Sequence, residues 1–316
     1  MSTQSHDHSH FGDLANQTTK RLMLSLSLTA GFVFVEVLAG IFGNSLALLT
    51  DAAHNFTDVI ALGLSWYALR IASKPANAGK TFGYHRVGIL VALVNSTTLI
   101  LIATGIFYEA WHRLLAPPVV DSVILIGVGT LAFFINAGTA LLVKTGSEHD
   151  LNLRSTFLHL MGDVMSTLGA VVAGVIIYFT KWNWLDPLVS VLIGGFILWN
   201  AWSILQQSIH ILLESTPENI DMQEMVEKIE TVDGVRGVHD LHVWSINENL
   251  RMLSAHVVTD NVTISDGLLI QQNINELLEH GYNIQHATLQ IECENCGHSL
   301  LYCDFDERRH QHQVEA

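Results

Sequence analysis

The sequence predicts a membrane protein in two parts, an all-α domain of six transmembrane helices followed by a small α+β domain in water. Of the 316 residues, 49% are hydrophobic and only 14% are charged, whereas a soluble globular chain carries about 25% charged residues. Most of the apolar residues lie within residues 22–213, and residues 214–316 have the composition of an ordinary soluble domain. This contrast predicts one domain in lipid and one in water.

Six apolar runs in the first part are each close to the ~20 residues that a helix needs to cross a bilayer. The connector between the first two runs is very short, around Gly43-Asn44, which predicts a tight helical hairpin. Asp186-Pro187 opens the last run, where a proline near the helix start loses no hydrogen bond. The predicted spans are residues 21–42, 45–71, 87–112, 121–143, 154–180 and 184–212.

Basic residues are distributed unevenly between the two predicted sides of the membrane. Arg113 and Lys181 fall on one side, against eight on the other. Because cytoplasmic loops carry the excess of basic residues, both termini are predicted to be cytoplasmic. No signal peptide is expected, since no basic segment leads into a cleavable apolar core. The eight residues are Lys20, Arg21, Arg70, Lys74, Lys80, Arg86, Lys144 and Arg154.

The second part alternates between helical and extended patterns. Residues 221–231 and 265–280 are amphipathic at helical spacing, and three segments alternate as strands, at 235–246, 251–259 and 284–292. The order helix–strand–strand–helix–strand predicts an α+β sandwich with its helices on one face. The expected domains are a disordered His-rich tail (1–19), the six-helix domain (20–213), the α+β domain (214–294) and a Cys/His-containing tail (295–316).

Charge and cysteine content narrow the function classes. The formal net charge of −15 argues against nucleic-acid binding, which needs a basic face. The three cysteines, Cys293, Cys296 and Cys303, include a C-x-x-C pair and are odd in number, which does not indicate a disulfide framework. In the N-terminal tail, weak metal capture by histidines and a simple solvated segment remain equally open.

Two His-x-x-x-Asp pairs lie within predicted transmembrane helices, His54/Asp58 and His159/Asp163. A charged side chain at the centre of such a helix costs roughly 2.5–3.5 kcal/mol on insertion scales. A spacing of four places each pair on one helical face. The two pairs can therefore converge into a set of two nitrogen and two oxygen ligands, which suits tetrahedral Zn²⁺. The alternative is two separate hydrogen-bonded pairs that hold helices together.

Further polar residues occur in the same helices. For Asp51, a capping or structural role is favoured over a place at the outer mouth of the site. For Glu36 and Glu109, helix packing is favoured over a proton path.

The ligand chemistry predicts how the metal could be released. Histidine and aspartate both lose metal when they are protonated, and histidine titrates near neutrality. Protons could therefore displace the metal, which gives metal/H⁺ antiport by alternating access. A membrane metalloenzyme is disfavoured because no H-E-x-x-H motif occurs in a helix. A sensor without transport leaves the buried acids unexplained, and four ligands would hold Zn²⁺ too tightly for a channel.

The motifs that follow resemble those of the cation diffusion facilitator family. They are the segment Ser45–His54 (SLALLTDAAH) followed by Asp58, Thr81–Arg86 (TFGYHR), His159–Asp163 (HLMGD) and Val238–Trp244 (VHDLHVW). Their order and spacing match from about residue 20 to residue 292, closest to the bacterial zinc exporters of the cobalt–zinc–cadmium resistance type.

The resemblance implies a homodimer in the bacterial inner membrane, with a ferredoxin-like cytoplasmic domain. It also implies proton-driven export of Zn²⁺ from the cytoplasm, and it makes His54 the residue that favours Zn²⁺, with Cd²⁺, Co²⁺ and Ni²⁺ left open. His85 matches a peripheral metal ligand, although a surface histidine is equally expected. Arg86 and Glu214 match a charge pair joining the third helix to the cytoplasmic domain.

The resemblance also implies a second metal site at the dimer interface of the cytoplasmic domain. Cys293 and Cys296, with His298, favour a soft metal site over a loose tail. His242, three residues after His239, is expected on the opposite strand face with a structural role. The matching ligand positions are His239, His256, His286 and Glu292.

Overall fold

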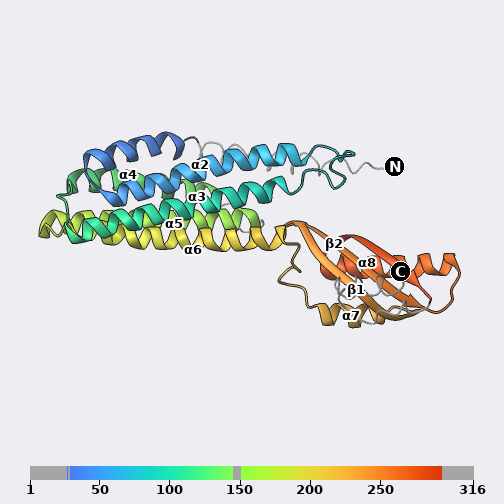
Figure 1. Ribbon diagram of the computed structural model, residues 1–316. Coiled ribbons are helices and arrows are strands. Elements are labelled where there is room, and N and C mark those ends of the chain that lie inside the picture. The colour runs from blue at the N-terminus through green and yellow to red at the C-terminus, as the bar shows by residue number, and fades with distance from the viewer. Residues whose placement is uncertain (1–26, 28, 145–150, 294–316) are drawn as a thin grey trace, which may run out of the picture. The chain divides into compact units, whose positions relative to one another are not determined.

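The computed structural model describes Ser27, residues 29–144 and residues 151–293, and the chain forms two compact units (Figure 1). Unit 1 contains the described chain up to Tyr67 together with Val91–Leu205. Unit 2 contains Ala68–Leu90 and the described chain from Gln206 onwards. The division cuts three long helices near one end, so these helix ends belong to unit 2.

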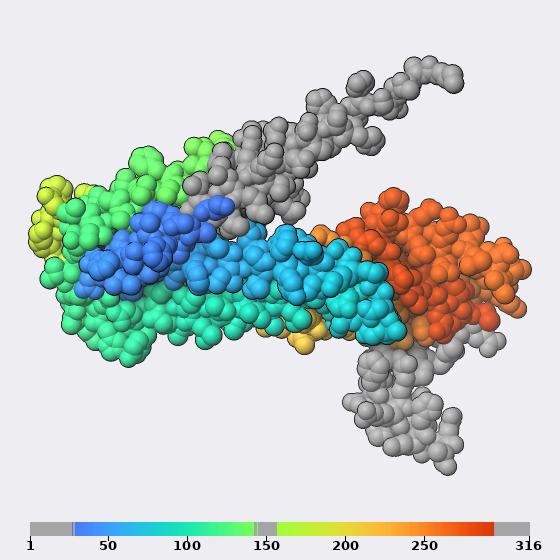
Figure 2. Space-filling model, turned by 90° about the horizontal axis from the view of Figure 1, so that it is seen from above, coloured from blue at the N-terminus to red at the C-terminus, as the bar shows by residue number. Residues whose placement is uncertain are grey.

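Unit 1 is built from helices that lie alongside one another (Figure 1). Its first described helix, Thr29–Phe42, lies against α2, as the dark and light blue segments of Figure 2 show. The predicted tight hairpin is confirmed: Asn44 adopts a positive φ of 51°, and a Cβ on Gly40 would lie 2.7 Å from Leu49 Cγ. The helices that follow are α2 (Leu46–Ala72), α3 (Val87–Leu115), α4 (Ser122–Lys144), α5 (Leu151–Thr180) and α6 (Leu185–Leu212).

Four of the described helices are long and apolar enough to cross a membrane: Val87–Leu115, Ser122–Leu141, Phe157–Thr180 and Leu185–Leu212. Many of their large side chains face outwards, with Phe179 78% exposed and Trp199 72% exposed. A water-soluble surface rarely exposes so much apolar area. The predicted transmembrane domain is therefore confirmed in these helices. The other two helices of this unit are not among these four: the described part of the first, Thr29–Phe42, is shorter, and α2 carries two aspartates, Asp51 and Asp58.

Unit 2 ends in an α+β domain whose element order is the predicted one. The sheet order is β1-β2-β3, with β1 antiparallel to β2 and β2 parallel to β3. Glu248 and Asn249 form the turn between β1 and β2, and Asn247 Oδ1 accepts the amide of Leu250 at 2.8 Å. The bounds are α7 (Met222–Glu230), β1 (Val235–Asn247), β2 (Leu250–Thr259), α8 (Ile264–Tyr282) and β3 (Ile284–Glu292).

The core of this domain lies between the sheet and the two helices. Ile229 of α7 and Ile274 of α8 are fully buried against Val257 of β2. Asp221 caps the start of α7 through the amides of Gln223 and Glu224, which satisfies two of the unpaired amides at a helix start. Because both helices cover one sheet face, the opposite face is free to carry polar side chains.

Candidate metal centre

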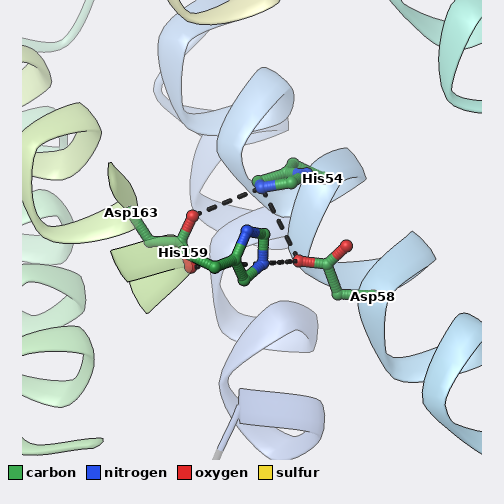
Figure 3. Close-up of side chains that lie close together, drawn as sticks. All are labelled: His54, Asp58, His159 and Asp163. Atoms are coloured by element: carbon green, nitrogen blue, oxygen red, sulfur yellow. Dashed lines mark hydrogen bonds and ion pairs between the residues drawn. The ribbon is translucent and has the colours of Figure 1, made fainter. Parts of the chain in front are cut away.

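The two His-x-x-x-Asp pairs lie on different helices of unit 1, one on α2 and one on α5 (Figure 3). Four-residue spacing aligns the two members of a pair one turn apart on the same face. The structure brings the two pairs together, so that one ligand atom from each residue lies within 4.8 Å of all the others. We call this group the tetrad: His54, Asp58, His159 and Asp163.

Each carboxylate of the tetrad contacts both imidazoles. Between the helices, His54 Nε2 lies 3.3 Å from Asp163 Oδ1, and His159 Nε2 lies 3.0 Å from Asp58 Oδ2. Within each helix the imidazole and carboxylate lie slightly further apart. His54 Nε2 lies 3.6 Å from Asp58 Oδ2 on α2, and His159 Nε2 lies 3.8 Å from Asp163 Oδ2 on α5. Ligands of a tetrahedral Zn²⁺ at about 2.0–2.2 Å lie about 3.3–3.6 Å apart. The observed spacings bracket that range, so the tetrad fits such an ion.

The two sides of the tetrad differ in burial. The side chains of His54 and Asp163 are 9% and 7% exposed, whereas those of Asp58 and His159 are 29% and 42% exposed. The Nδ1 atom of His54 is buried without a hydrogen-bond partner among the described residues, whereas its Nε2 atom faces the carboxylate of Asp163. Each helix therefore supplies one buried and one accessible ligand, and an ion can reach the group from one side.

The start of α2 is held by a carboxylate from another helix. Asp186, fully buried on α6, accepts hydrogen bonds from Ser45 Oγ at 2.5 Å and from the amide of Leu46 at 2.7 Å. A carboxylate at a helix N-terminus is favoured by the unpaired amides and the helix dipole. Ser45 and Asp186 thus cap α2, and Asp51, for which a cap was one expectation, lies further inside the helix.

The sheet of unit 2 carries a second group, which we call the triad: His239 on β1, His256 on β2 and Glu292 on β3. His256 Nδ1 lies 2.9 Å from Glu292 Oε1, and His239 Nε2 lies 3.4 Å from Glu292 Oε2. His239 Nε2 and Glu292 Oε2 are buried and have no hydrogen-bond partner within the described part of the chain. A buried nitrogen and oxygen left unpaired side by side are suited to sharing a cation.

The structure corrects the position of His242. His239 pairs with His256 and His242 pairs with Ser254, so two residues of β1, Asp240 and Leu241, oppose one residue of β2. This β-bulge, at which Asp240 has a φ of 49°, changes the alternation of side chains. His242 therefore shares the outer face with His239, and its Nε2 lies 3.1 Å from Asp240 Oδ1. Sequence reasoning missed Asp240, which also lies 3.7 Å from His256 Nε2.

The other predicted cytoplasmic ligands are not part of the triad. His286 is exposed and pairs with Met252 in the sheet register. It precedes Glu292 by six residues on one strand, a separation of about 20 Å, so it cannot join the triad within one chain. Cys293 is exposed directly after β3. Cys296, His298, Cys303 and the N-terminal histidines lie outside the described residues.

His85 lies in the loop between α2 and α3. It lines a cavity of about 490 Å³ together with Tyr84 and Trp244, and it belongs to neither metal-ligand group found among the described residues. The predicted pair is present, with Arg86 Nη2 2.8 Å from Glu214 Oε1, but the side chains are 35% and 59% exposed. An exposed pair of this kind contributes little to stability.

Comparison with known proteins gives two family matches that together span most of the chain. The cation efflux transmembrane domain matches residues 22–213, and the cytoplasmic domain of cation efflux proteins matches residues 217–294.

Similar proteins include the "Cadmium, cobalt and zinc/H(+)-K(+) antiporter" of Bacillus subtilis, 38% identical over 93% of this chain and 96% of that protein. The "Zinc transporter ZitB" of Pectobacterium atrosepticum is 37% identical over 96% of this chain and 93% of that protein. The "Metal cation efflux system protein CzcD" of Cupriavidus metallidurans is 34% identical over 92% of this chain and 90% of that protein. All three are transporters and not enzymes.

Proposed function

Because the chain belongs to the cation efflux family, the cation diffusion facilitators, and is an integral membrane metal transporter, we propose that it exports Zn²⁺ from the cytoplasm in exchange for H⁺. The tetrad is the transport site. The observation that carries the proposal is the convergence of two imidazoles and two carboxylates from different helices, with ligand atoms within 4.8 Å. A group that only joined helices would not need four converging ligands of this kind.

The ligand set favours Zn²⁺ over other divalent ions. Two nitrogens and two oxygens match its preferred donors and its coordination number of four. Ca²⁺ and Mg²⁺ take more oxygen ligands, and softer ions prefer thiolates, which the sequence lacks before Cys293. The names of the relatives include cadmium and cobalt, so Cd²⁺ and Co²⁺ are secondary substrates in the proposal.

Proton exchange follows from the same ligands. All four must be deprotonated to bind metal, so protons and metal compete for the tetrad. Protons arriving from the far side empty the site, and the protonated tetrad returns to the cytoplasmic side by alternating access. One relative is named as an H⁺-K⁺ antiporter, which supports exchange against monovalent cations.

The proposed assembly is a homodimer in the lipid of a bacterial inner membrane, with both termini in the cytoplasm. Thr29–Phe42 and α2 complete six spans with the four apolar helices. The α+β domain has the elements of a ferredoxin-like unit without its first strand. Its triad binds Zn²⁺, and His286, Cys293 and Cys296 act as further ligands in the dimer. His85 is proposed as a peripheral ligand.

Metal uptake into inverted membrane vesicles tests the transport function. Wild type and Asp163→Ala are compared with Zn²⁺, Cd²⁺, Co²⁺ and Mn²⁺, with and without a pH gradient. Glu109→Gln is the matched control, since Glu109 is a half-exposed acid on α3 that pairs with Arg113. The expected result is gradient-dependent Zn²⁺ uptake that Asp163→Ala abolishes and Glu109→Gln preserves. Uptake by Asp163→Ala at the wild-type rate would refute the tetrad as the transport site.

A further inference from the structure

Unit 1 contains a second buried polar group that the metal ligands do not use. Glu36 lies on the Thr29–Phe42 helix, and Asp51 and Asn55 lie on α2, with exposures of 0%, 3% and 4%. Asn55 Nδ2 lies 3.2 Å from Glu36 Oε2 and 3.5 Å from Asp51 Oδ2. One neutral amide therefore holds two carboxyl groups in the interior of the membrane domain.

Among the described residues, the charged neighbours of this group are mostly acidic. The charges that act on Glu36 are those of Asp51 on α2 and Asp163 on α5, both acidic. The described residues that act on Asp51 also include Asp58, which is acidic, and His54, which is basic. Two adjacent ionised carboxylates are costly in a low-dielectric interior. Binding a single proton removes one of the two charges.

The hydrogen bonds point to the same ligand. Glu36 Oε1 is fully buried and has no hydrogen-bond partner among the described residues. The carboxyl groups of Glu36 and Asp51 both accept from the same amide, Asn55 Nδ2, so they lie next to each other. Two ionised carboxylates offer acceptors only, whereas a protonated one supplies the missing donor. A proton therefore satisfies both the geometry and the charge.

We propose that Glu36 is a proton-binding site of the transporter, which holds a proton shared with Asp51 while the tetrad is empty and releases it to water when a divalent cation binds. The inference rests on the proton-coupled export proposed above. Asn55 is the positioning residue, because its amide joins the two carboxyl groups. Glu36 itself is not a metal ligand and lies on a different helix from all four members of the tetrad.

The electrostatic link between the two sites explains the exchange. With the tetrad empty, the negative charge of Asp163 favours a neutral Glu36. A divalent cation in the tetrad neutralises the charge of its two carboxylates and so favours ionised Glu36. Metal entry thus expels a proton that never occupied a metal ligand, and metal release restores it. The number of protons exchanged per ion is then greater than the tetrad alone provides.

Counting protons released on metal binding tests this proposal. Purified full-length protein in lipid nanodiscs is titrated with Zn²⁺ in weak buffer free of Na⁺ and K⁺, and a pH indicator reports the protons released. Glu36→Gln keeps the acceptor for Asn55 but cannot ionise. It should bind Zn²⁺ and release about one proton fewer per ion than wild type, because the carboxyl group is lost. Glu109→Gln, the matched control, should give the wild-type count.

A measurement on the wild type keeps the test independent of how the variant folds. Infrared difference spectra should show the C=O band of a protonated carboxyl group that disappears on Zn²⁺ addition. Absence of that band in the metal-free wild type overturns the proposal, as does an unchanged proton count in Glu36→Gln. These outcomes leave proton-coupled export standing if wild-type uptake responds to a pH gradient. A wild type that releases no protons overturns both proposals.

Discussion

Ser45 Oγ donates a hydrogen bond of 2.5 Å to Asp186 Oδ1, although 141 residues separate them in the chain. The same carboxylate accepts the amide of Leu46 at 2.7 Å and that of Ala47 at 3.3 Å. Ser45 precedes the helix that carries His54 and Asp58, so a residue of α6 fixes where that helix begins. The position of half the tetrad therefore depends on an acid outside it.

The variant Asp186→Asn should destabilise unit 1. The new side-chain amide would keep one acceptor oxygen but present an NH₂ group to one of the α2 donors. Loss of a charge-assisted bond costs about 1.5–3 kcal/mol, so thermal unfolding in detergent should occur at a lower temperature and Zn²⁺ should bind more weakly.

Asp121→Asn is the matched control for this effect. Asp121 is exposed and accepts the amides of Val123 and Ile124 at the start of α4. Asparagine caps helices about as well as aspartate, so this change should leave the unfolding temperature nearly unaltered. Equal shifts in the two variants would contradict the role given to Asp186.

His54→Asp should broaden selectivity towards Cd²⁺. The change replaces a nitrogen ligand by a third carboxylate, which can bind through one or two oxygens, so the site could supply more ligand atoms and accept a larger ion. Uptake of each metal into inverted vesicles measures the change as a ratio of Cd²⁺ to Zn²⁺ rates. A ratio equal to that of wild type would show that His54 does not select the metal.

Zinc should compact the isolated domain 214–316 if the triad binds it and joins two copies. Small-angle scattering with and without Zn²⁺ measures this, and identical profiles would remove the idea. Glu292→Ala should abolish the response, because Glu292 contacts both His239 and His256. His286→Ala tests whether His286 binds the metal at the triad of the other copy. It should abolish the response if His286 does so, and leave the response unchanged if the triads alone bind Zn²⁺.

The Arg236–Asp260 pair gives a pH-dependent prediction. Arg236 Nη2 lies 2.7 Å from Asp260 Oδ2, and this hydrogen bond lowers the pKa of Asp260. A carboxyl group whose pKa is lower in the folded domain than in the unfolded chain stabilises the domain at pH values above its unfolded pKa, about 3.9. This stabilisation is lost as the pH falls through the pKa of the folded state. Both side chains are about two-thirds exposed, so the effect should be small.

Urea unfolding of domain 214–316 at neutral and acidic pH measures this difference. Asp260→Asn should be slightly less stable than wild type at neutral pH, and the two should converge at low pH. A gap that widens on acidification would contradict the assignment.

The sequence allowed the tetrad to be predicted because both pairs are local. Helical spacing aligns His54 with Asp58 and His159 with Asp163, and burying such residues in lipid is so costly that their presence indicates a function. The strands and helices of the α+β domain could also be predicted, because apolar residues recur with a different period in a strand than in a helix. In both cases the signal lies within one element.

Features that depend on contacts between elements could not be predicted in this way. The bulge at Asp240 moves His242 to the other face of β1, and the sequence gives no sign of the extra residue. Glu36 and Asp51 were expected in packing or structural roles, because nothing in the sequence shows that Asn55 joins them across two helices. The capping of α2 by Asp186 requires three-dimensional proximity that no spacing rule supplies.

The tetrad also has a mechanical consequence. Its two shortest contacts, His54 to Asp163 and His159 to Asp58, both run between α2 and α5. An ion held by all four residues therefore cross-links the two helices. Sliding one helix past the other by a single turn, about 5.4 Å, would part every pair that joins them. In the proposed transport cycle, metal release would therefore require α2 and α5 to move apart as well as protons to occupy the ligands.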